Sequence, residues 1–227
     1  MIMTFEYLIF DLVILIGPVL ALVFYPRIRK PSFKACGIAI TIPLVLFTIA
    51  DLFVTNVFWY FNHLFIWGPH IGTVPIEEVL FFITVPFACL VLWVNWRDLP
   101  TSSVVGKSIP ITLSIIAGIL TIMSLYLGLY YSASVCITFL LSICLDFLLK
   151  TKLFQKSTFL IFLGFVNILT FIFNLYLTAR PIVTYNPLMK SNLNIVTIPI
   201  EDFVYGMVLI SLVIMIYERT LRKRSFR

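Results

Sequence analysis

Two adjacent carboxylates occur twice in the chain, each time within the same six-residue pattern. The first pattern is Thr73-Val-Pro-Ile-Glu-Glu78 and the second is Thr197-Ile-Pro-Ile-Glu-Asp202, an offset of 124 residues. Each pair stands at the start of a long apolar run, where an ionisable group is costly unless it is paired or functional. A neutral carboxylic acid beside an ionised one can serve as general acid and general base in one site. The candidate catalytic residues are Glu77, Glu78, Glu201 and Asp202.

A purely structural explanation exists for each pattern. Proline suits the start of a helix, acids in the first turn complement the helix dipole, and Thr73 or Thr197 could cap the helix. A dipole needs one acid, however, and adjacent side chains on a helix point about 100° apart. The recurrence of both acids therefore favours chemistry. Protonation of an alkene fits an apolar substrate, because it needs only an acid, walls that tolerate a cation, and a base.

Aromatic residues make up 16% of the chain and gather near both acidic pairs. Each ring face can stabilise a cation by about 0.5–2 kcal/mol where water is excluded. Aromatic and polar residues at the ends of the neighbouring apolar runs are therefore candidates for substrate binding. They are Asp51, Trp59, Tyr60, Asn62, Asn174, Thr178, Tyr185 and Asn186.

The composition predicts an all-α membrane protein. Of the 227 residues, 61% are hydrophobic and only 11% are charged, and the mean hydropathy is +1.09. A soluble domain has about 25% charged residues. Runs of about 20 apolar residues, the length needed to cross a bilayer as a helix, occur seven times. We predict spans at 5–25, 35–55, 75–95, 108–127, 129–149, 157–179 and 199–218.

The basic residues predict how the chain lies in the cell membrane. All but two of the 16 Lys and Arg residues fall on one side of this arrangement, the exceptions being Arg180 and Lys190. The positive-inside rule then places the N-terminus outside and the C-terminus in the cytoplasm. Both acidic pairs lie on the non-cytoplasmic side, where Arg180 and Lys190 are the nearest cations. Asp146, one helical turn before Lys150, is expected to pair with it.

The duplicated pattern predicts an internal repeat. Spans one to three and five to seven share an orientation, so the fourth span acts as a connector. We expect a first repeat at 1–100, a linker helix at 101–128 and a second repeat at 129–227. In membrane proteins built from repeats, sites commonly lie at the repeat interface.

Several other functions have little support. The basic residues form short clusters between spans, which does not suggest a nucleic-acid surface. The chain has no Gly-x-Gly for a dinucleotide, and its four cysteines form no CxxC pair, so we expect neither cofactor nor metal. A retinal photoreceptor would need a lysine in the last span, and 199–218 has none. A proton- or cation-coupled transporter using the acids as a relay remains an alternative.

The chain also resembles a known family, the heterodimer-type lycopene beta-cyclases, which occur as two small membrane subunits or as one fused chain. The resemblance rests on the two Pro-Ile-Glu-[Glu/Asp] motifs, the stretch from Leu177 to Pro187, and Phe81-Phe82, and it covers nearly the whole chain. It implies a cofactor-independent isomerisation of lycopene or a related linear carotene. An acid protonates the terminal double bond, the neighbouring double bond closes a ring, and proton loss leaves a beta-ionone ring.

By this resemblance the four motif carboxylates would be the functional acids. Membrane lipid and other enzymes of carotenoid biosynthesis would be its further partners. A carotenoid hydratase of the same superfamily, in which water captures the cation, is the nearest alternative.

Overall fold

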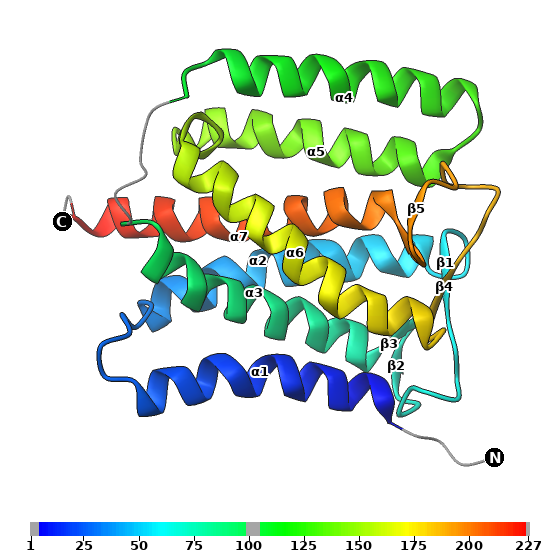
Figure 1. Ribbon diagram of the computed structural model, residues 1–227, viewed down its shortest axis with the longest axis horizontal. Coiled ribbons are helices and arrows are strands. Elements are labelled where there is room, and N and C mark those ends of the chain that lie inside the picture. The colour runs from blue at the N-terminus through cyan, green and yellow to red at the C-terminus, as the bar shows by residue number, and fades with distance from the viewer. Residues whose placement is uncertain (1–4, 99–104, 226–227) are drawn as a thin grey trace.

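The chain folds into seven long helices in the computed structural model, which describes residues 5–98 and 105–225 (Figure 1). All seven are long and apolar enough to cross a membrane. The predicted spans are confirmed to within a few residues, except that the last helix continues further. The helices are α1 (Glu6–Phe24), α2 (Phe33–Val54), α3 (Ile76–Trp96), α4 (Ser108–Tyr126), α5 (Tyr130–Leu148), α6 (Ser157–Ala179) and α7 (Ile200–Ser225).

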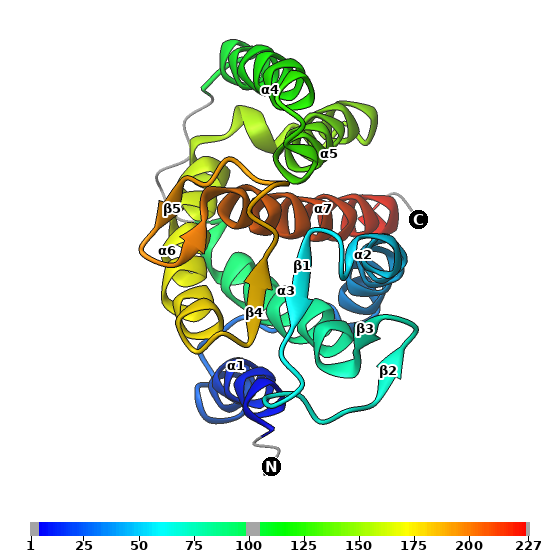
Figure 2. The ribbon, with the colours of Figure 1, turned by 90° about the vertical axis from the view of Figure 1, so that its right-hand side faces the viewer.

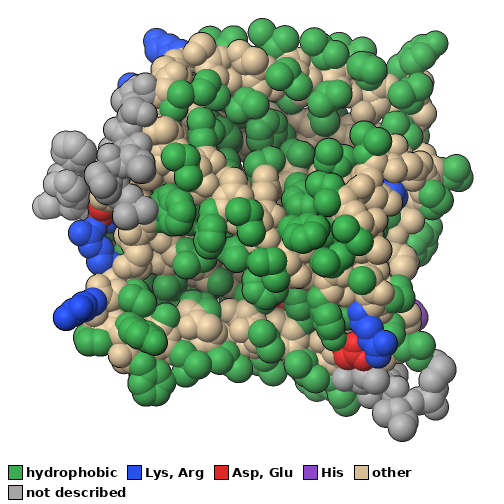
Figure 3. All heavy atoms as spheres, viewed as in Figure 1, with side chains coloured by type: hydrophobic (Ala, Val, Ile, Leu, Met, Phe, Trp, Pro, Cys, Tyr) green, Lys and Arg blue, Asp and Glu red, His purple; other side chains and the backbone are tan. Residues whose placement is uncertain are grey.

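The two helices that carry the acidic pairs lie at the centre of the bundle. Helix α3 packs against α1 and α2, α7 packs against α2, α5 and α6, and α3 and α7 also contact each other. Helix α4 packs on α5 at one edge of the molecule (Figures 1 and 2). Apolar side chains cover the face shown in Figure 3, as expected for a multi-pass membrane protein.

The described part of the chain also contains six short strands, which the sequence did not predict, at the end of the bundle that carries the acids. Strand β1 (Trp59–Phe61) pairs antiparallel with β4 (Val183–Tyr185). Two hairpins, β2–β3 (His70–Ile71 and Val74–Pro75) and β5–β6 (Asn194–Ile195 and Ile198–Pro199), lead directly into α3 and α7. The hairpins therefore fix the first turn of each acid-bearing helix.

The β1–β4 ribbon joins segments that lie 124 residues apart in an almost symmetric way. The Asn62 N–H donates to Ile182 O over 2.9 Å, and the Asn186 N–H donates to Phe58 O over 2.8 Å. Adding 124 to the donor of the first bond and subtracting 124 from its acceptor gives the second bond, so the two segments exchange roles. This recurrence is what two repeats around a pseudo-two-fold axis would produce. The expected boundary between first repeat and linker, at 100 and 101, lies outside the described residues.

The threonines of the two motifs do not cap helices, so that expectation is wrong. Thr73 lies in the β2–β3 turn and donates to Leu52 O over 3.2 Å, and the Thr197 hydroxyl lies 2.7 Å from that of Thr178. The residue before α3 is Pro75, which has no capping side chain.

The hairpin turns predict opposite effects for two substitutions at equivalent positions. Gly72 has φ +61° and Val196 has φ +60°. A β-branched residue is strained there, by about 1–2 kcal/mol. A Cβ on Gly72 would also lie 2.7 Å from Leu52 Cδ2. We expect Gly72→Ala to lower the unfolding temperature in detergent, and Val196→Gly, at a site that is 70% exposed, to raise it. If both substitutions changed the unfolding temperature in the same direction, the explanation by backbone strain would be wrong.

Asp146 does not pair with Lys150, so the expected ion pair is wrong. Its carboxylate instead accepts hydrogen bonds from the Thr151 hydroxyl and from the N–H groups of Leu153 (2.9 Å) and Phe154 (3.2 Å). Lys150 has φ +58°, so the helix has already ended there and the spacing of one helical turn no longer applies.

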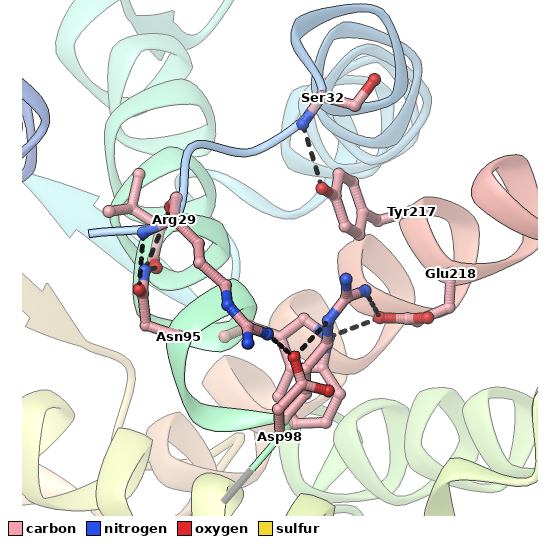
Figure 4. Close-up of polar contacts among 9 residues, drawn as sticks. Arg29, Ser32, Asn95, Asp98, Tyr217 and Glu218 are labelled. Carbon is pink, nitrogen blue, oxygen red and sulfur yellow. Dashed lines mark hydrogen bonds and ion pairs between the residues drawn. The ribbon is translucent and has the colours of Figure 1, made fainter. Parts of the chain in front are cut away.

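A polar network ties α3 to α7 at the end opposite the acids (Figure 4). Glu218 accepts hydrogen bonds from Arg97 (2.9 Å) and from the Trp93 ring N–H (2.8 Å). The Tyr217 hydroxyl accepts the N–H of Ser32 over 3.1 Å. The bonds to Glu218 thus connect α3 to α7 at the end opposite the acids.

Candidate active site

The first acid of each pair points toward a loop and holds it in place. Glu77 is fully buried and accepts the N–H of Trp67. Glu201 is 4% exposed and accepts the N–H of Ser191 over 2.7 Å. These two bonds again lie 124 residues apart. The loops that precede the hairpins are thus anchored to the first turn of α3 and of α7.

The second acid of each pair lines a common apolar cavity. Glu78 from α3 and Asp202 from α7 both face a cavity of about 130 Å³ between α1, α3, α6 and α7. Adjacent residues on a helix point about 100° apart, which explains why one acid of each pair faces the cavity and the other the loop. Aromatic walls surround the two carboxyls, including Trp59, Phe61, Phe81, Phe173 and Tyr205.

A tyrosine from the first turn of α1 holds one cavity acid, and a tyrosine from the first turn of α5 holds the other. The Tyr7 hydroxyl donates to Glu78 over 2.5 Å, and the Tyr131 hydroxyl donates to Asp202 over 2.7 Å. The sequence reasoning missed both tyrosines, although they lie 124 residues apart like the acids they contact. That offset, applied to every polar residue, would have found them.

The two cavity acids differ in how many hydrogen bonds they accept. Asp202 accepts from Tyr131, from Tyr185 over 2.5 Å and from Asn174 over 3.1 Å. Within the described part of the chain, Tyr7 is the single side chain that donates to Glu78. Burial, followed by the nearby Asp202 carboxylate, raises the pKa of Tyr185 well above its usual value. Tyr185 therefore stays protonated and keeps donating at neutral pH.

Three of the eight expected binding residues line this cavity. They are Trp59, Asn174 and Tyr185. Asp51 lines a different cavity, between α2, α5 and α7, where the Tyr205 hydroxyl lies 3.4 Å from its Oδ1.

The other four expected binding residues lie away from the cavity wall. Tyr60 is 40% exposed, because it alternates along β1 with the buried Trp59 and Phe61. Asn62 and Asn186 each accept the backbone N–H two residues later, over 3.1 Å in both cases, and so shape equivalent turns. The Thr178 hydroxyl donates to Asn174 O over 2.9 Å.

The two basic side chains expected near the acids, Arg180 and Lys190, bind residues other than the cavity acids. Arg180 forms an ion pair with Glu6 over 2.7 Å and lies over the Phe65 ring, 4.9 Å from its centroid. The Lys190 ammonium donates to the Asn194 side chain over 2.9 Å. Among residues 5–98 and 105–225, hydroxyl and amide donors, and not a cation, thus make the direct side-chain contacts to the cavity acids.

Comparison with protein families gives a match over most of the chain. The model of the lycopene cyclase family matches residues 5–96 and 126–220. These two segments contain α1 to α3 and α5 to α7, and nearly all of α4 lies between them. Neither a curated protein nor a solved structure matches the chain. With the family match spanning both acidic motifs, the chain belongs to the lycopene cyclase family.

Proposed function

We propose that this membrane enzyme converts the linear ends of lycopene, or of a related carotene, into beta-ionone rings without a cofactor. The observation that carries the proposal is the placement of Glu78 and Asp202 in one apolar, aromatic cavity. The family supports an enzyme acting on lycopene, and the cavity supplies the acid and the base that such a reaction needs.

The proposed reaction begins with proton transfer from one cavity acid to the terminal double bond. The resulting tertiary cation is attacked by the neighbouring double bond, which forms the ring carbon–carbon bond and moves the positive charge into the ring. The second acid removes a proton from a ring carbon. Substrate and product are therefore isomers, and the enzyme resets when that proton returns to the first acid.

The hydrogen bonds favour Glu78 as the proton donor and Asp202 as the acceptor. Donors to a carboxylate stabilise its ionised form, and Asp202 has three whereas Glu78 has one. The side chains of Glu77 and Glu201 bind the preceding loops. We assign them positioning roles, which refines the expectation that all four carboxylates are catalytic.

The cavity walls suit a carbocation. Ring faces stabilise a nearby cation by about 0.5–2 kcal/mol each when water is excluded. Trp59, Phe61, Phe81 and Phe173 line the same cavity as both acids. We expect these rings to protect the cation from water, which favours cyclisation over hydration.

The same proposal includes two parallel repeats with the site between them. The recurrence of hydrogen bonds at an offset of 124 residues, from the β1–β4 ribbon to the tyrosine–acid pairs, supports it. We retain the orientation with an outer N-terminus and a cytoplasmic C-terminus, since nearly all basic residues lie at the end opposite the acids.

Expression in cells that accumulate lycopene tests the function directly. Chromatography of the pigments should show gamma- or beta-carotene. A hydroxylated carotene would instead indicate a hydratase. Unchanged lycopene, with the protein present in the membrane, would contradict the proposal and favour the transporter.

Loss of one donor to Asp202 is expected to slow the reaction measurably. Tyr185→Phe removes a hydrogen bond to a charged group, which is worth about 1.5–3 kcal/mol, so turnover should fall about tenfold or more. Tyr60→Phe is the matched control, since that hydroxyl on β1 lies outside the cavity. Equal rates of ring formation in the two variants would show that the Tyr185 hydroxyl has no role in the reaction.

A further inference from the structure

A second apolar cavity lies on the other side of the central helices. It has a volume of about 430 Å³ and is lined by α2, α5 and α7. Figure 2 shows α2 and α6 on opposite sides of α3, so this cavity and the acidic cavity flank the centre of the bundle. Its walls are mainly apolar, with the aliphatic side chains Leu46, Val54, Val135, Leu145 and Leu212 among them.

The two cavities meet at a shared aromatic wall. Trp59, Tyr131 and Tyr205 line both of them. The Trp59 ring centroid lies 5.5 Å from that of Tyr131 and 6.1 Å from that of Tyr205. These three rings therefore form the boundary between the two cavities, which a chain that occupies both must cross.

The size of the acidic cavity limits how much substrate it can hold. Its volume of about 130 Å³ is slightly below that of an engineered cavity of about 150 Å³ that binds benzene. It can accordingly hold one six-membered ring or the folded end that forms it. The long polyene of a linear carotene must lie elsewhere.

One acidic side chain of the second cavity, Asp51, lies beside a residue that lines both cavities. Asp51 is 1% exposed, and its Oδ2 has no hydrogen-bond partner within the described part of the chain. Its Oδ1 lies 3.4 Å from the hydroxyl of Tyr205, one of the shared residues. Asp51 is thus placed to orient the Tyr205 ring between the two cavities, while the aliphatic walls beyond it suit a hydrocarbon.

We infer that the α2–α5–α7 cavity holds the polyene chain of the substrate while its reacting end occupies the acidic cavity. This inference rests on the proposed cyclase function and extends it to the remainder of the substrate. Because Ser134 and Ala50 lie on opposite walls of this cavity, a bulky side chain at either position would occupy the space of the polyene.

The test compares Ser134→Trp and Ala50→Trp with a control, Ile116→Trp, on α4, where the side chain is 49% exposed. With the proteins in lipid vesicles and linear carotene in the bilayer, the two wall variants should raise KM about tenfold or more. Their kcat at saturation should stay within about twofold of the control, because the acids are untouched. An unchanged KM in both wall variants, or a fall in kcat alone, would overturn the inference.

A binding measurement separates failure of this inference from failure of the proposed function. Purified wild-type and control proteins should retain linear carotene through a detergent wash, and the wall variants should lose it, whether or not rings form. If the wild type binds carotene but makes no ring, the cyclase proposal fails and the cavity assignment stands. If filling the cavity displaces phospholipid and leaves carotene retention unchanged, its occupant is a lipid acyl chain and the inference is wrong.

Discussion

Glu78→Gln is expected to lower the rate of ring formation by about 100-fold or more, the usual contribution of general acid catalysis. Glutamine keeps the shape of the side chain and can still accept the Tyr7 hydroxyl, but it cannot give a proton to an alkene. The rate should be measured with purified protein in lipid vesicles that contain lycopene. The unfolding temperature should change little, since the variant fills the same space.

The matched control for this variant is Glu77→Gln, one residue earlier. The Glu77 side chain accepts the Trp67 N–H and does not line the cavity, and a glutamine oxygen can accept the same bond. We expect turnover to fall by less than about tenfold, since a neutral acceptor weakens one hydrogen bond by roughly 1 kcal/mol. A larger loss for Glu77→Gln than for Glu78→Gln would reverse the roles assigned within the pair.

Asp202→Asn is expected to lower ring formation by a similar factor, about 100-fold or more, because the base is removed. The cation would still form, and its proton would return to Glu78 instead of passing to Asp202. In heavy water the recovered lycopene should therefore carry deuterium at the carbon that accepts the proton. Mass spectrometry of the recovered pigment measures this exchange.

The same deuterium measurement decides which acid is the donor. Glu78→Gln should give recovered lycopene without deuterium, because no cation forms. If Asp202→Asn blocks the exchange and Glu78→Gln permits it, then Asp202 is the donor and the assignment from hydrogen-bond number is wrong. Absence of deuterium in both variants would mean that protonation needs the two acids together.

Hydropathy was sufficient to predict the spans, and motif spacing selected four acids, of which two line the cavity. Proline or charge marks most of the helix borders, and apolar runs of this length have few alternatives to a membrane helix. The duplicated motif identified both acidic pairs, Glu78 and Asp202 included, without any knowledge of packing. It could not show which member of each pair faces the cavity, because that depends on the rotation of the helix about its axis.

Features that depend on loop geometry were not predicted from the sequence. The hairpins before α3 and α7 have strands of two residues each, too short for any alternating pattern. Tyr60 was expected in the site because its neighbours are aromatic, but its place in β1 turns it outward. Asp146 was assigned to Lys150 by helical spacing, whereas the backbone turns at Lys150 and exposes N–H groups that the carboxylate binds instead.

The register of the β1–β4 ribbon bears on how such a protein could have arisen. Trp59 lies opposite Tyr185, and Phe61 lies opposite Val183. After a shift of 124, positions 183 and 185 correspond to positions 59 and 61. The ribbon therefore pairs position 59 of each half with position 61 of the other half. Two identical half-length chains could close the same ribbon upon themselves. The geometry of the ribbon is therefore compatible with an ancestor that was a symmetric homodimer. Fusion of two gene copies would then have allowed the sequence of each half to change independently.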